Sequence, residues 1–441
     1  MDKIIEYIIN WWNSTFNFSN PEAIYRSITN IILIVFSFLL LYRSLYTFIG
    51  FFMKGRRYKD APMDKRYACV ISARNEEKVI GNLIESIKKQ TYNQDLIQIF
   101  VVADNCTDKT AQICRDLGAI VYERFDDKHV SKGYALEFLF DHIAEDYGVL
   151  SNDYYLVFDA DNLLKRDFIE QMNKGFHEGY DALTSFRNIK NFDTNLISAG
   201  YGIHFYRKPL IANRARSILN VSTNVTGTGY GIKACHLVNG WHYTSLTEDA
   251  EFSADAISNN LKIGYCEEAE IYDEQPTALK VAFKQRLRWR RGGLQAFVKR
   301  SPKLFVNFFK TGKFSSYDMY FELFPYDLFS FIMALLVQLF GMFYSLFTTG
   351  HYNILIFLKY LGNFFLGAYI GSIGIGLLVM IKERKRLKCS FWRKVLYLIT
   401  WPWFDIVSIP IALVAIFKHV TWKPITHNDA KTIEDIEKKN L

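Results

Sequence analysis

Four long apolar runs limit what this chain can fold into, because they gather at its two ends. Residues 28–53 are charged only at Arg43, and residues 328–348 carry no charge. A third run covers residues 353–381 and a fourth covers residues 395–417. A helix needs about 20 apolar residues to cross a bilayer, and each of these runs is long enough. The sequence therefore predicts a membrane protein with transmembrane helices at both ends.

The third and fourth runs differ in their small and polar residues. Five glycines between residues 362 and 376 predict close contact between helices in lipid. Pro402, Asp405 and Pro410 interrupt the fourth run, which predicts a kinked helix or two short pieces. The Asp405 carboxylate is expected to face protein or a water-filled path, since a charge facing lipid is costly. If the fourth run crosses the membrane, the tail that follows lies outside the cell; if it forms a hairpin, the tail stays inside.

Basic clusters set the expected orientation. Lysines and arginines gather at residues 54–59 and 382–388, directly after the first and third runs. Such clusters favour the cytoplasmic side, which predicts a multi-pass protein of the cell membrane with residues 57–313 in the cytosol. The net charge of +8 suits a phosphate-bearing ligand or an anionic membrane surface, and is too diffuse to indicate nucleic acid. The six cysteines form no C-x-x-C pair, so the sequence indicates neither a disulfide framework nor a zinc site.

Between the apolar runs, strand and helix patterns alternate. Residues 67–72, 97–103 and 154–158 are short, apolar and rich in β-branched and aromatic side chains, as strands are. Residues 77–90 show the apolar spacing of a helix between the first two strands. This alternation predicts an α/β domain with a mostly parallel sheet flanked by helices. In such sheets, ligands bind at the carboxyl ends of the strands.

The expected domain organisation has five parts. An N-terminal segment with one transmembrane helix covers residues 1–56, and a cytosolic α/β domain covers residues 57–292. Residues 293–327 interleave Phe, Leu and Tyr with Lys, which predicts amphipathic helices at the membrane interface. A C-terminal transmembrane region covers residues 328–418, and a polar tail covers residues 419–441.

Two carboxylates follow the third predicted strand. Asp159 and Asp161 stand one residue apart, directly after residues 154–158. Carboxylate oxygens at this spacing can hold Mg²⁺ or Mn²⁺ together with the phosphates of a substrate. A solvated loop or turn is the alternative for a lone D-x-D pair.

Polar residues also follow the first two predicted strands. Asn75 and Glu76 come after one strand and Asp104 after the other, where such side chains can read a nucleobase edge by hydrogen bonds. The alternative is that Asp104 or Asn105 only caps the helix that follows.

Two further motifs carry charge. Lys132 can place a positive charge against a diphosphate, and Gly133 beside it permits close backbone approach. The sequence Thr247-Glu248-Asp249 precedes a helical pattern, and Asp249 can act as a general base if an acceptor hydroxyl lies within reach. The alternatives are a solvated lysine for the first motif and a Thr247 N-cap with acidic residues in the first helical turn for the second.

An arginine-rich segment runs from Gln285 to Gly292 and contains four arginines and Trp289. Arginine grips phosphate oxygens in a fork, and tryptophan offers a flat face to a sugar or a base. A positive-inside flank or a lipid-headgroup patch is the alternative. Other nucleotide and hydrolase motifs are missing, including the phosphate loop, H-E-x-x-H and G-x-S-x-G. The glycine-rich stretch at 227–231 lacks the third glycine of a dinucleotide-binding loop, because Ile232 stands there.

The order of these motifs resembles that of the membrane-bound family-two glycosyltransferases, which include the synthases of cellulose, chitin, hyaluronan and poly-N-acetylglucosamine. The similarity rests on D-x-D at 159–161, T-E-D at 247–249 and Q-x-x-R-W at 285–289, and it covers the whole predicted cytosolic domain. It implies a GT-A fold. The chain departs from the family at residues 103–105, where Ala-Asp-Asn replaces the commoner two-acid pattern. It also has fewer apolar runs than some secreting synthases, which argues against a self-contained translocation channel.

The resemblance also implies roles for single residues. The uridine and the diphosphate would be bound by Asn75, Glu76, Asp104 and Lys132. The Mg²⁺ or Mn²⁺ ion would be held by Asp161, with Asp159 close by. Asp249 would be the catalytic base, with Glu248 beside it, and Thr228 would lie near the acceptor. The residues that close over the diphosphate and the acceptor sugar would be Gln285, Arg288 and Trp289.

The resulting expectation is an inverting, processive hexosyltransferase that moves a sugar from a UDP-sugar to a growing β-linked polysaccharide at the cytoplasmic membrane face. The Q-x-x-R-W motif favours this polymerase. The alternative is a non-processive transferase that adds one sugar to a lipid acceptor. A transporter without catalysis fits poorly with a large cytosolic domain and few apolar runs. The expected partners are the UDP-sugar, a polysaccharide or lipid-linked acceptor, the lipid bilayer and accessory secretion subunits.

Overall fold

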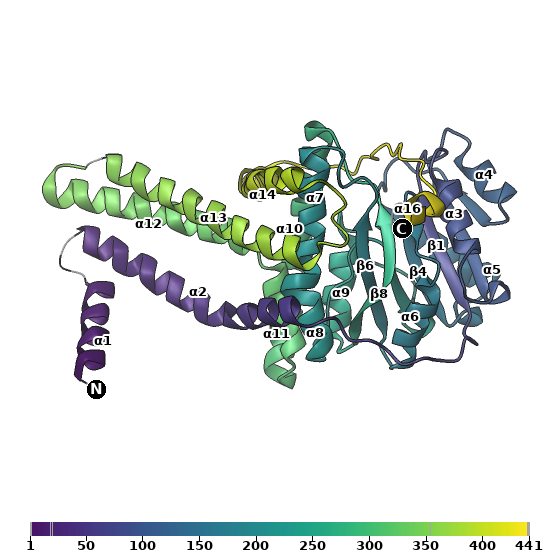
Figure 1. Cartoon of the computed structure of the whole chain (residues 1–441), viewed down its shortest axis with the longest axis horizontal. Coiled ribbons are helices and arrows are strands. Elements are labelled where there is room, and N and C mark those ends of the chain that lie inside the picture. Colours follow the sequence, from purple (N-terminus) through teal and green to yellow (C-terminus); the bar gives the residue numbers. More distant parts are fainter. Residues whose placement is uncertain (1, 18, 20, 353, 439–441) are drawn as a thin grey trace.

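The computed structural model describes residues 2–17, 19, 21–352 and 354–438. Three long helices project from one end of an α/β body (Figure 1): α2 (Pro21–Phe52), α12 (Tyr326–Thr349) and α13 (Ile354–Lys382). The short helix α1 (Asp2–Thr15) precedes them. Residue 353, the expected start of the third run, and residues 439–441 of the expected tail lie outside the described part of the chain.

The body is built on one eight-stranded sheet with the strand order β3-β2-β1-β4-β7-β6-β8-β5. Its strands are β1 (Tyr67–Ala73), β2 (Ile97–Asp104), β3 (Ile120–Arg124), β4 (Tyr154–Asp159), β5 (Leu163–Leu164), β6 (Ala182–Ile189), β7 (Tyr230–Lys233) and β8 (Ile263–Asp273). Strands β1 to β4 pair in parallel, as do β6 and β8, whereas β7 and β5 pair antiparallel to their neighbours. The predicted α/β class with a mostly parallel sheet is confirmed, and the three predicted strands lie side by side at its centre as β2, β1 and β4.

Helices cover both faces of the sheet because the strands alternate apolar side chains between them. In β1, Tyr67, Cys69 and Ile71 point into one core, and Ala68 and Val70 point into the other. The first core is closed by α3 (Ile80–Lys88), α4 (Thr110–Asp116) and α6 (Phe168–His177). The second core is closed by α5 (Lys132–Asp146) and α9 (Glu248–Ser258).

The predicted helix at 77–90 is present but shorter. Helix α3 begins at Ile80 and ends at Lys88, with Ile80, Leu83, Ile84 and Ile87 buried. Residues 76–79 form a turn instead, in which the Glu76 carbonyl accepts from the backbone N–H groups of residues 79 and 80.

A layer of helices joins the body to the projecting bundle. It contains α7 (Leu196–Lys208), a π-helical turn (Pro209–Asn213), α8 (Arg214–Ile218), α10 (Leu279–Thr311), α11 (Phe314–Leu323), α14 (Phe391–Ile406) and α15 (Ser408–Phe417). Helix α10 is continuous through residue 292, so the expected boundary between domain and interfacial helices falls inside one helix. The fourth apolar run is split at Val407, as its prolines predict, and α14 and α15 pack on α7 and α10. The Asp405 carboxylate faces protein as expected, 3.2 Å from Arg207.

Among the described residues, four helical segments are long and apolar enough to cross a membrane: Ser27–Phe52, Tyr326–Thr349, Phe357–Lys382 and Phe391–Phe417, the last of which contains both α14 and α15. These positions agree with the four predicted runs. The close helix contact that the glycines of the third run permit is made at one of the five within the described residues. A Cβ atom added at Gly362, Gly367, Gly371 or Gly374 would meet no atom of the described residues within 4 Å beyond its own helical turn. Gly376 is the exception among these five glycines, because a Cβ atom added there would lie 2.8 Å from the Trp401 side chain of α14.

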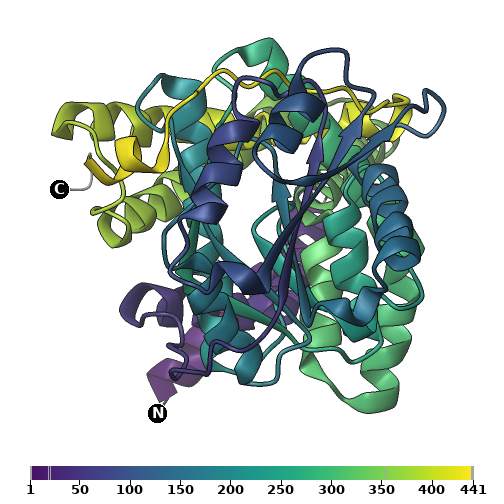
Figure 2. The same cartoon turned by 90° about the vertical axis from the view of Figure 1, so that its right-hand side faces the viewer.

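The polar tail returns to the body. Figure 2 shows the C-terminal segment, in yellow, running back over the sheet domain. Its last helix, α16 (Ile433–Lys438), is held by ion pairs of Glu434 with Lys89 at 3.0 Å and of Glu437 with Arg166 at 2.8 Å. The tail and the α/β body therefore share one side of the molecule.

Candidate active site

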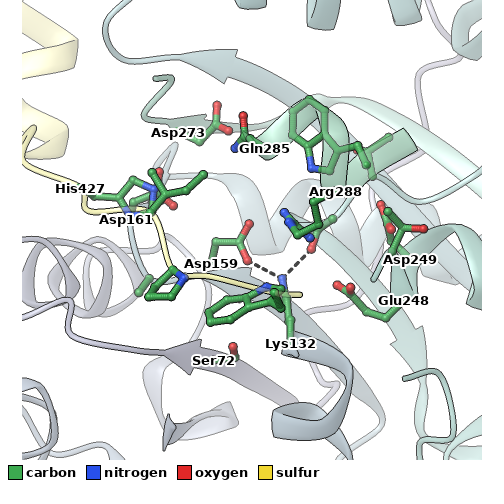
Figure 3. Close-up of a pocket in the computed structure, with 18 of the residues that line it drawn as sticks. Ser72, Lys132, Asp159, Asp161, Glu248, Asp249, Asp273, Gln285, Arg288 and His427 are labelled. Atoms are coloured by element: carbon green, nitrogen blue, oxygen red, sulfur yellow. Dashed lines mark hydrogen bonds and ion pairs between the residues drawn. The ribbon is translucent and has the colours of Figure 1, made fainter. Parts of the chain in front are cut away.

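A cavity of about 350 Å³ opens at the carboxyl ends of β1, β2 and β4 (Figure 3). Most of the predicted site residues line it: Glu76, Asp104, Lys132, Asp159, Asp161, Glu248, Asp249, Gln285, Arg288 and Trp289. Side chains that are up to 213 residues apart in the sequence, from Glu76 to Trp289, therefore converge on one space. Two predicted residues, Asn75 and Thr228, are absent from its lining.

Thr228 and Asn75 support the cavity from behind. The Thr228 hydroxyl accepts from the backbone N–H of Asp159 at 2.9 Å and donates to Asn162, and its side chain is buried. Thr228 thus fixes the end of β4, where sequence reasoning expected it near the acceptor. Asn75 has a positive φ of 57° and accepts from the N–H of Thr107 at 2.8 Å, which ties the loops after β1 and β2 together.

Asp104 is buried at the end of β2. Arg124 lies 2.7 Å from its carboxylate and Arg74 lies 3.9 Å away. Burial raises the pKa of Asp104 overall, although both arginines oppose the rise. The capping alternative for Asp104 is wrong, because Asp108 accepts from the first N–H of α4, that of Thr110, at 3.0 Å.

Lys132 forms an ion pair with Asp159 and donates to the Gly227 carbonyl at 2.6 Å. It is the first residue of α5, whose N-cap is Ser131. Gly133 is required by close packing, since a Cβ atom there would lie 2.2 Å from the carbonyl oxygen of Tyr243. The expected approach of the Gly133 backbone to a ligand is therefore replaced by contact with another segment of the chain.

Asp161 lies deeper than Asp159 and is held by the chain around it. One carboxylate oxygen accepts from the backbone N–H of Glu274 at 2.8 Å. Burial alone would raise the pKa of Asp161, but His427 and Lys190 lower it overall. On the neighbouring strand end, burial raises the pKa of Asp273 to about 6, with Asp161 adding to the rise. One oxygen of Asp273 is buried without a hydrogen-bond partner among the described residues.

These carboxylates fit a divalent cation. Asp159, Asp161 and Asp273 repel one another electrostatically, and the unpartnered oxygen of Asp273 adds a further acceptor. Within residues 2–438 as described, no three His, Cys, Asp or Glu side chains are placed to hold a metal ion by themselves. An ion bound here would need phosphate oxygens of a substrate as further ligands, which is how Mg²⁺ and Mn²⁺ usually bind.

The T-E-D motif begins α9. Asp249 accepts from the backbone N–H groups of Ala250 and Gly227, and burial raises its pKa. Burial and the neighbouring Asp249 raise the pKa of Glu248 to about 7. Thr247 occupies the N-cap position, but its hydroxyl makes no capping bond and is buried without a partner among the described residues. At the cavity wall, Glu248 is thus buried and Asp249 half-buried.

The Q-x-x-R-W residues approach from α10. Arg288 donates to the Leu246 carbonyl at 2.9 Å and so holds the loop that leads into T-E-D. The Gln285 side-chain oxygen is buried without a partner among the described residues. Trp289 packs edge-on against Tyr201 and Phe205 of α7, each with ring centroids 5.9 Å apart. Its remaining surface faces the cavity.

Sequence reasoning missed the contribution of the tail. The ring of Trp422 lies 5.6 Å from the Arg74 guanidinium, and His427 Nδ1 lies 2.9 Å from the Glu76 carboxylate. Burial opposes a charge on His427, but Asp161, Glu76 and Glu274 together raise its pKa to about 10. The tryptophan and the histidine in an otherwise charged tail were a visible signal, but the path of the chain that precedes them was not predictable.

Five lining residues from the sheet and α7 were also missed: Ser72, Arg187, His204, Phe205 and Asp273. Arg187 pairs with Asp273 at 2.6 Å and lies 4.0 Å over the Phe205 ring. None of them belongs to a short motif, so no sequence signal marked them.

Comparison with known proteins agrees with this geometry. A probable glycosyltransferase of Bacillus subtilis, YdaM, is 25% identical over 294 residues, covering 64% of this chain and 67% of its own length. The beta-monoglucosyldiacylglycerol synthase of Synechocystis is 25% identical over 236 residues, covering 52% of this chain. The alignment spans about half of that relative's length, 48%.

A solved structure shows the same fold. The mannosyltransferase PcManGT from Pyrobaculum calidifontis, in complex with GDP-Man and Mn2+, matches with a TM-score of 0.53 at 13% identity, covering 88% of this chain and 99% of that one. The fold of the body is therefore GT-A-like. The family model described as "Glycosyltransferase like family 2" matches residues 64–292, just over half of the chain and including all three motifs. The chain belongs to glycosyltransferase family 2.

Proposed function

We propose that this protein transfers a hexose, with inversion, from a UDP-sugar to a hydroxyl group that reaches the cavity from the membrane side. The observation that supports this proposal is the convergence of D-x-D, T-E-D and Q-x-x-R-W on one cavity of about 350 Å³. The uridine would lie near Asp104 and Glu76, at the ends of β2 and β1. Lys132 and Arg288 would contact the diphosphate. These groups supply the positive charge that a leaving diphosphate requires.

A divalent cation, Mg²⁺ or Mn²⁺, would be held by Asp161 with Asp159 and would stabilise negative charge on the leaving diphosphate. The carboxylate cluster described above supports this choice, as does the mannosyltransferase PcManGT, whose structure is a complex with GDP-Man and Mn2+. The chain must then free Asp159 from its ion pair with Lys132. A diphosphate can replace Asp159 as the partner of that lysine.

Asp249 is the proposed catalytic base. It lies beside the buried Glu248 in a half-buried position at the cavity wall, and the N–H groups of Ala250 and Gly227 orient its carboxylate. Asp249 would take the proton of the acceptor hydroxyl as that oxygen attacks the sugar from the face opposite to the diphosphate. An in-line displacement of this kind turns an α-linked donor into a β-linked product. Trp289 would orient the acceptor, which contributes positioning and not proton transfer.

We place the α/β body on the cytoplasmic side, following the basic clusters after the first and third runs. The tail contacts Glu76 and Lys89 on that body, so residues 391–417 enter and leave the membrane on one side. The hairpin alternative for the fourth run is therefore preferred. Helices α2, α12 and α13 would cross, and α14 and α15 would lie at the interface.

Two acceptors remain from the sequence, a growing β-linked polysaccharide and a lipid. The Q-x-x-R-W motif lines the cavity and keeps the processive polymerase as the second candidate. We favour the lipid acceptor, because only three helices are left to cross and a relative is named as a beta-monoglucosyldiacylglycerol synthase. Accessory subunits would be needed only for the polymer.

The proposed transfer is tested with the full chain in detergent micelles containing total membrane lipid. Each UDP-sugar is supplied separately with Mn²⁺, and released UDP and lipid-bound sugar are measured. We expect one donor to be used, and we expect Asp249→Asn to lower the rate by about 10²- to 10⁴-fold while UDP binding is retained. Asp116→Asn, at an exposed site on α4, is the matched control. Equal rates for Asp249→Asn and the wild type would refute the proposal.

A further inference from the structure

A second, larger cavity of about 950 Å³ lies on the membrane side of the proposed active site. The two cavities share His204, Trp289 and Gly293 in their linings, so they meet at the Trp289 side chain. The walls of the larger cavity come from α7 and α10 on one side and from α12, α13 and the α14–α15 bend on the other. A ligand that fills it would therefore lie partly between the helices that we expect to cross the membrane.

The floor of this cavity holds three arginines, and two of them are neutralised. Arg207 pairs with Asp405 at 3.2 Å, and Arg290 pairs with Asp327. Arg286 differs, because among the described residues it forms no ion pair. Its guanidinium donates to the Ser408 hydroxyl and lies 4.1 Å over the Phe404 ring.

Arg286 remains a cation at neutral pH, although burial lowers its pKa to about 10. A half-buried guanidinium without a carboxylate partner leaves donors unused, and an anionic ligand satisfies them with charge-assisted hydrogen bonds. His204 nearby adds no charge, because burial and the neighbouring arginines hold its pKa well below the usual range. Glu322 also lines the cavity, but it pairs with Lys208 and Arg216. Arg286 is therefore the lining cation that the described structure leaves without an ion pair.

The wall along α13 is smooth. Gly367, Ala368 and Gly371 face the cavity, and a Cβ atom at either glycine would meet no described atom within 4 Å beyond its own turn. Leu33 of α2 and Leu328 of α12 add further apolar side chains to the lining. The polar residues of the α13 wall are Asn363 and Ser372, and the Ser372 hydroxyl already donates to Asp405 at 2.9 Å. The apolar stretch between them suits a hydrocarbon chain, whereas a glycan would need more polar partners or water along its path.

We infer that the 950 Å³ cavity binds the acceptor as an anionic lipid, with a hydrocarbon chain along the α13 wall and a phosphate group at Arg286. This inference rests on the proposed function, because the accepting hydroxyl would pass Trp289 to reach Asp249. Arg286 is then a specificity-determining residue that selects anionic over neutral or zwitterionic lipids. A transferase built for a long polysaccharide would not need that selection.

The proposed contact of the hydrocarbon chain with the α13 wall is tested by a substitution that fills this part of the cavity. Gly371→Leu adds a side chain that projects into the cavity, and Gly362→Leu adds the same side chain to open space on the same helix, outside the lining. The full chain is purified in detergent, incubated with phosphatidylglycerol or with phosphatidylcholine of the same chains, and bound lipid is counted by native mass spectrometry. We expect the wild type and Gly362→Leu to retain phosphatidylglycerol, and Gly371→Leu to retain about tenfold less.

The floor is tested by Arg286→Gln, with Arg384→Gln at an exposed basic site as the control. We expect Arg286→Gln to lose the preference for phosphatidylglycerol over phosphatidylcholine, by about tenfold for one charge-assisted contact.

Equal occupancy of the two lipids in the wild type would overturn the inference, as would unchanged occupancy in Gly371→Leu. A water-soluble polymer made at the wild-type rate by Gly371→Leu would also overturn it. UDP binding is measured on the same samples, so a failure of the donor site is seen separately from a failure of the lipid site.

Discussion

The donor side and the acceptor side of the site differ in how their charges are paired. On the donor side, Lys132 pairs with Asp159, Arg124 with Asp104, and His427 with Glu76. Asp273 pairs with Arg187 there and keeps one oxygen without a hydrogen-bond partner among the described residues. On the acceptor side, the described structure gives Arg286 no ion pair and leaves polar atoms of Gln285 and Thr247 buried without partners. The Trp289 side chain lines both cavities and separates the two sides.

Because of this difference, the donor and the acceptor would bind in different ways. A donor must exchange partners that the protein already supplies, so its binding can be coupled to the release of Asp159 for a metal ion. An acceptor supplies partners that the protein lacks, and a buried polar group without one costs about 1–3 kcal/mol. We therefore expect substitutions on the donor side to abolish chemistry and those on the acceptor side to change selectivity.

The largest effect is expected at Asp161. Asp161→Asn keeps the volume of the side chain but removes the charge that would hold a divalent ion, so the transfer rate should fall by about 10²- to 10³-fold. Removal of divalent ions with a chelator should have the same effect on the wild type, and Mn²⁺ should restore only the wild type. UDP release at saturating donor measures both. A chelator-resistant wild type would show that the carboxylate cluster has another role.

Lys132→Met should have the next largest effect. The substitution removes the partner of Asp159 and the cation expected at the diphosphate, so kcat/KM for the donor should fall by about 10- to 100-fold. Lys128→Met, at an exposed lysine close by in the sequence, should leave the rate unchanged. If both variants behaved alike, the pairing on the donor side would be structural only.

The pH dependence of kcat/KM should report the protonation of the Glu248–Asp249 pair. A base must be deprotonated, and burial raises the pKa of Asp249 and brings that of Glu248 to about 7. The value of kcat/KM should therefore fall as the pH falls through the raised pKa of this coupled pair, above the usual carboxylate range. Glu248→Gln removes the neighbouring negative charge, so the acid limb should move to lower pH. If the acid limb of the kcat/KM profile stayed in place or moved to higher pH in Glu248→Gln, the proposed interaction between Glu248 and Asp249 would be contradicted.

The smallest effect is expected at the tail. Trp422→Ala removes the ring beside Arg74, and we expect KM for the donor to rise by about 3- to 10-fold with little change in kcat. Trp392→Ala, at an exposed tryptophan of α14, is the matched control. An equal rise in both variants would show that the tail does not cover the donor.

Local pattern in the sequence predicts the centre of the fold and most of the site. The strands at 67–72, 97–103 and 154–158 and the residues that follow them are found together, because parallel strands bring their carboxyl ends to one edge. The tail cannot be placed in this way, because its path depends on whether residues 391–417 cross the membrane or turn back. Spacing alone assigns Gly371 to helix contacts, since it cannot distinguish a packed face from a cavity wall. Arg187 and Asp273 escape the pattern because they meet only through the pairing of β6 with β8.

The anomeric configuration of the product shows whether Asp249 acts as the base of an inverting transfer. The purified chain is given the UDP-sugar that it uses, in its α-linked form, and the first transferred sugar is examined by proton NMR. The proposed role of Asp249, as the base for attack from the face opposite to the diphosphate, predicts a β-linked product. An α-linked product would contradict it and remove Asp249 from the role of catalytic base.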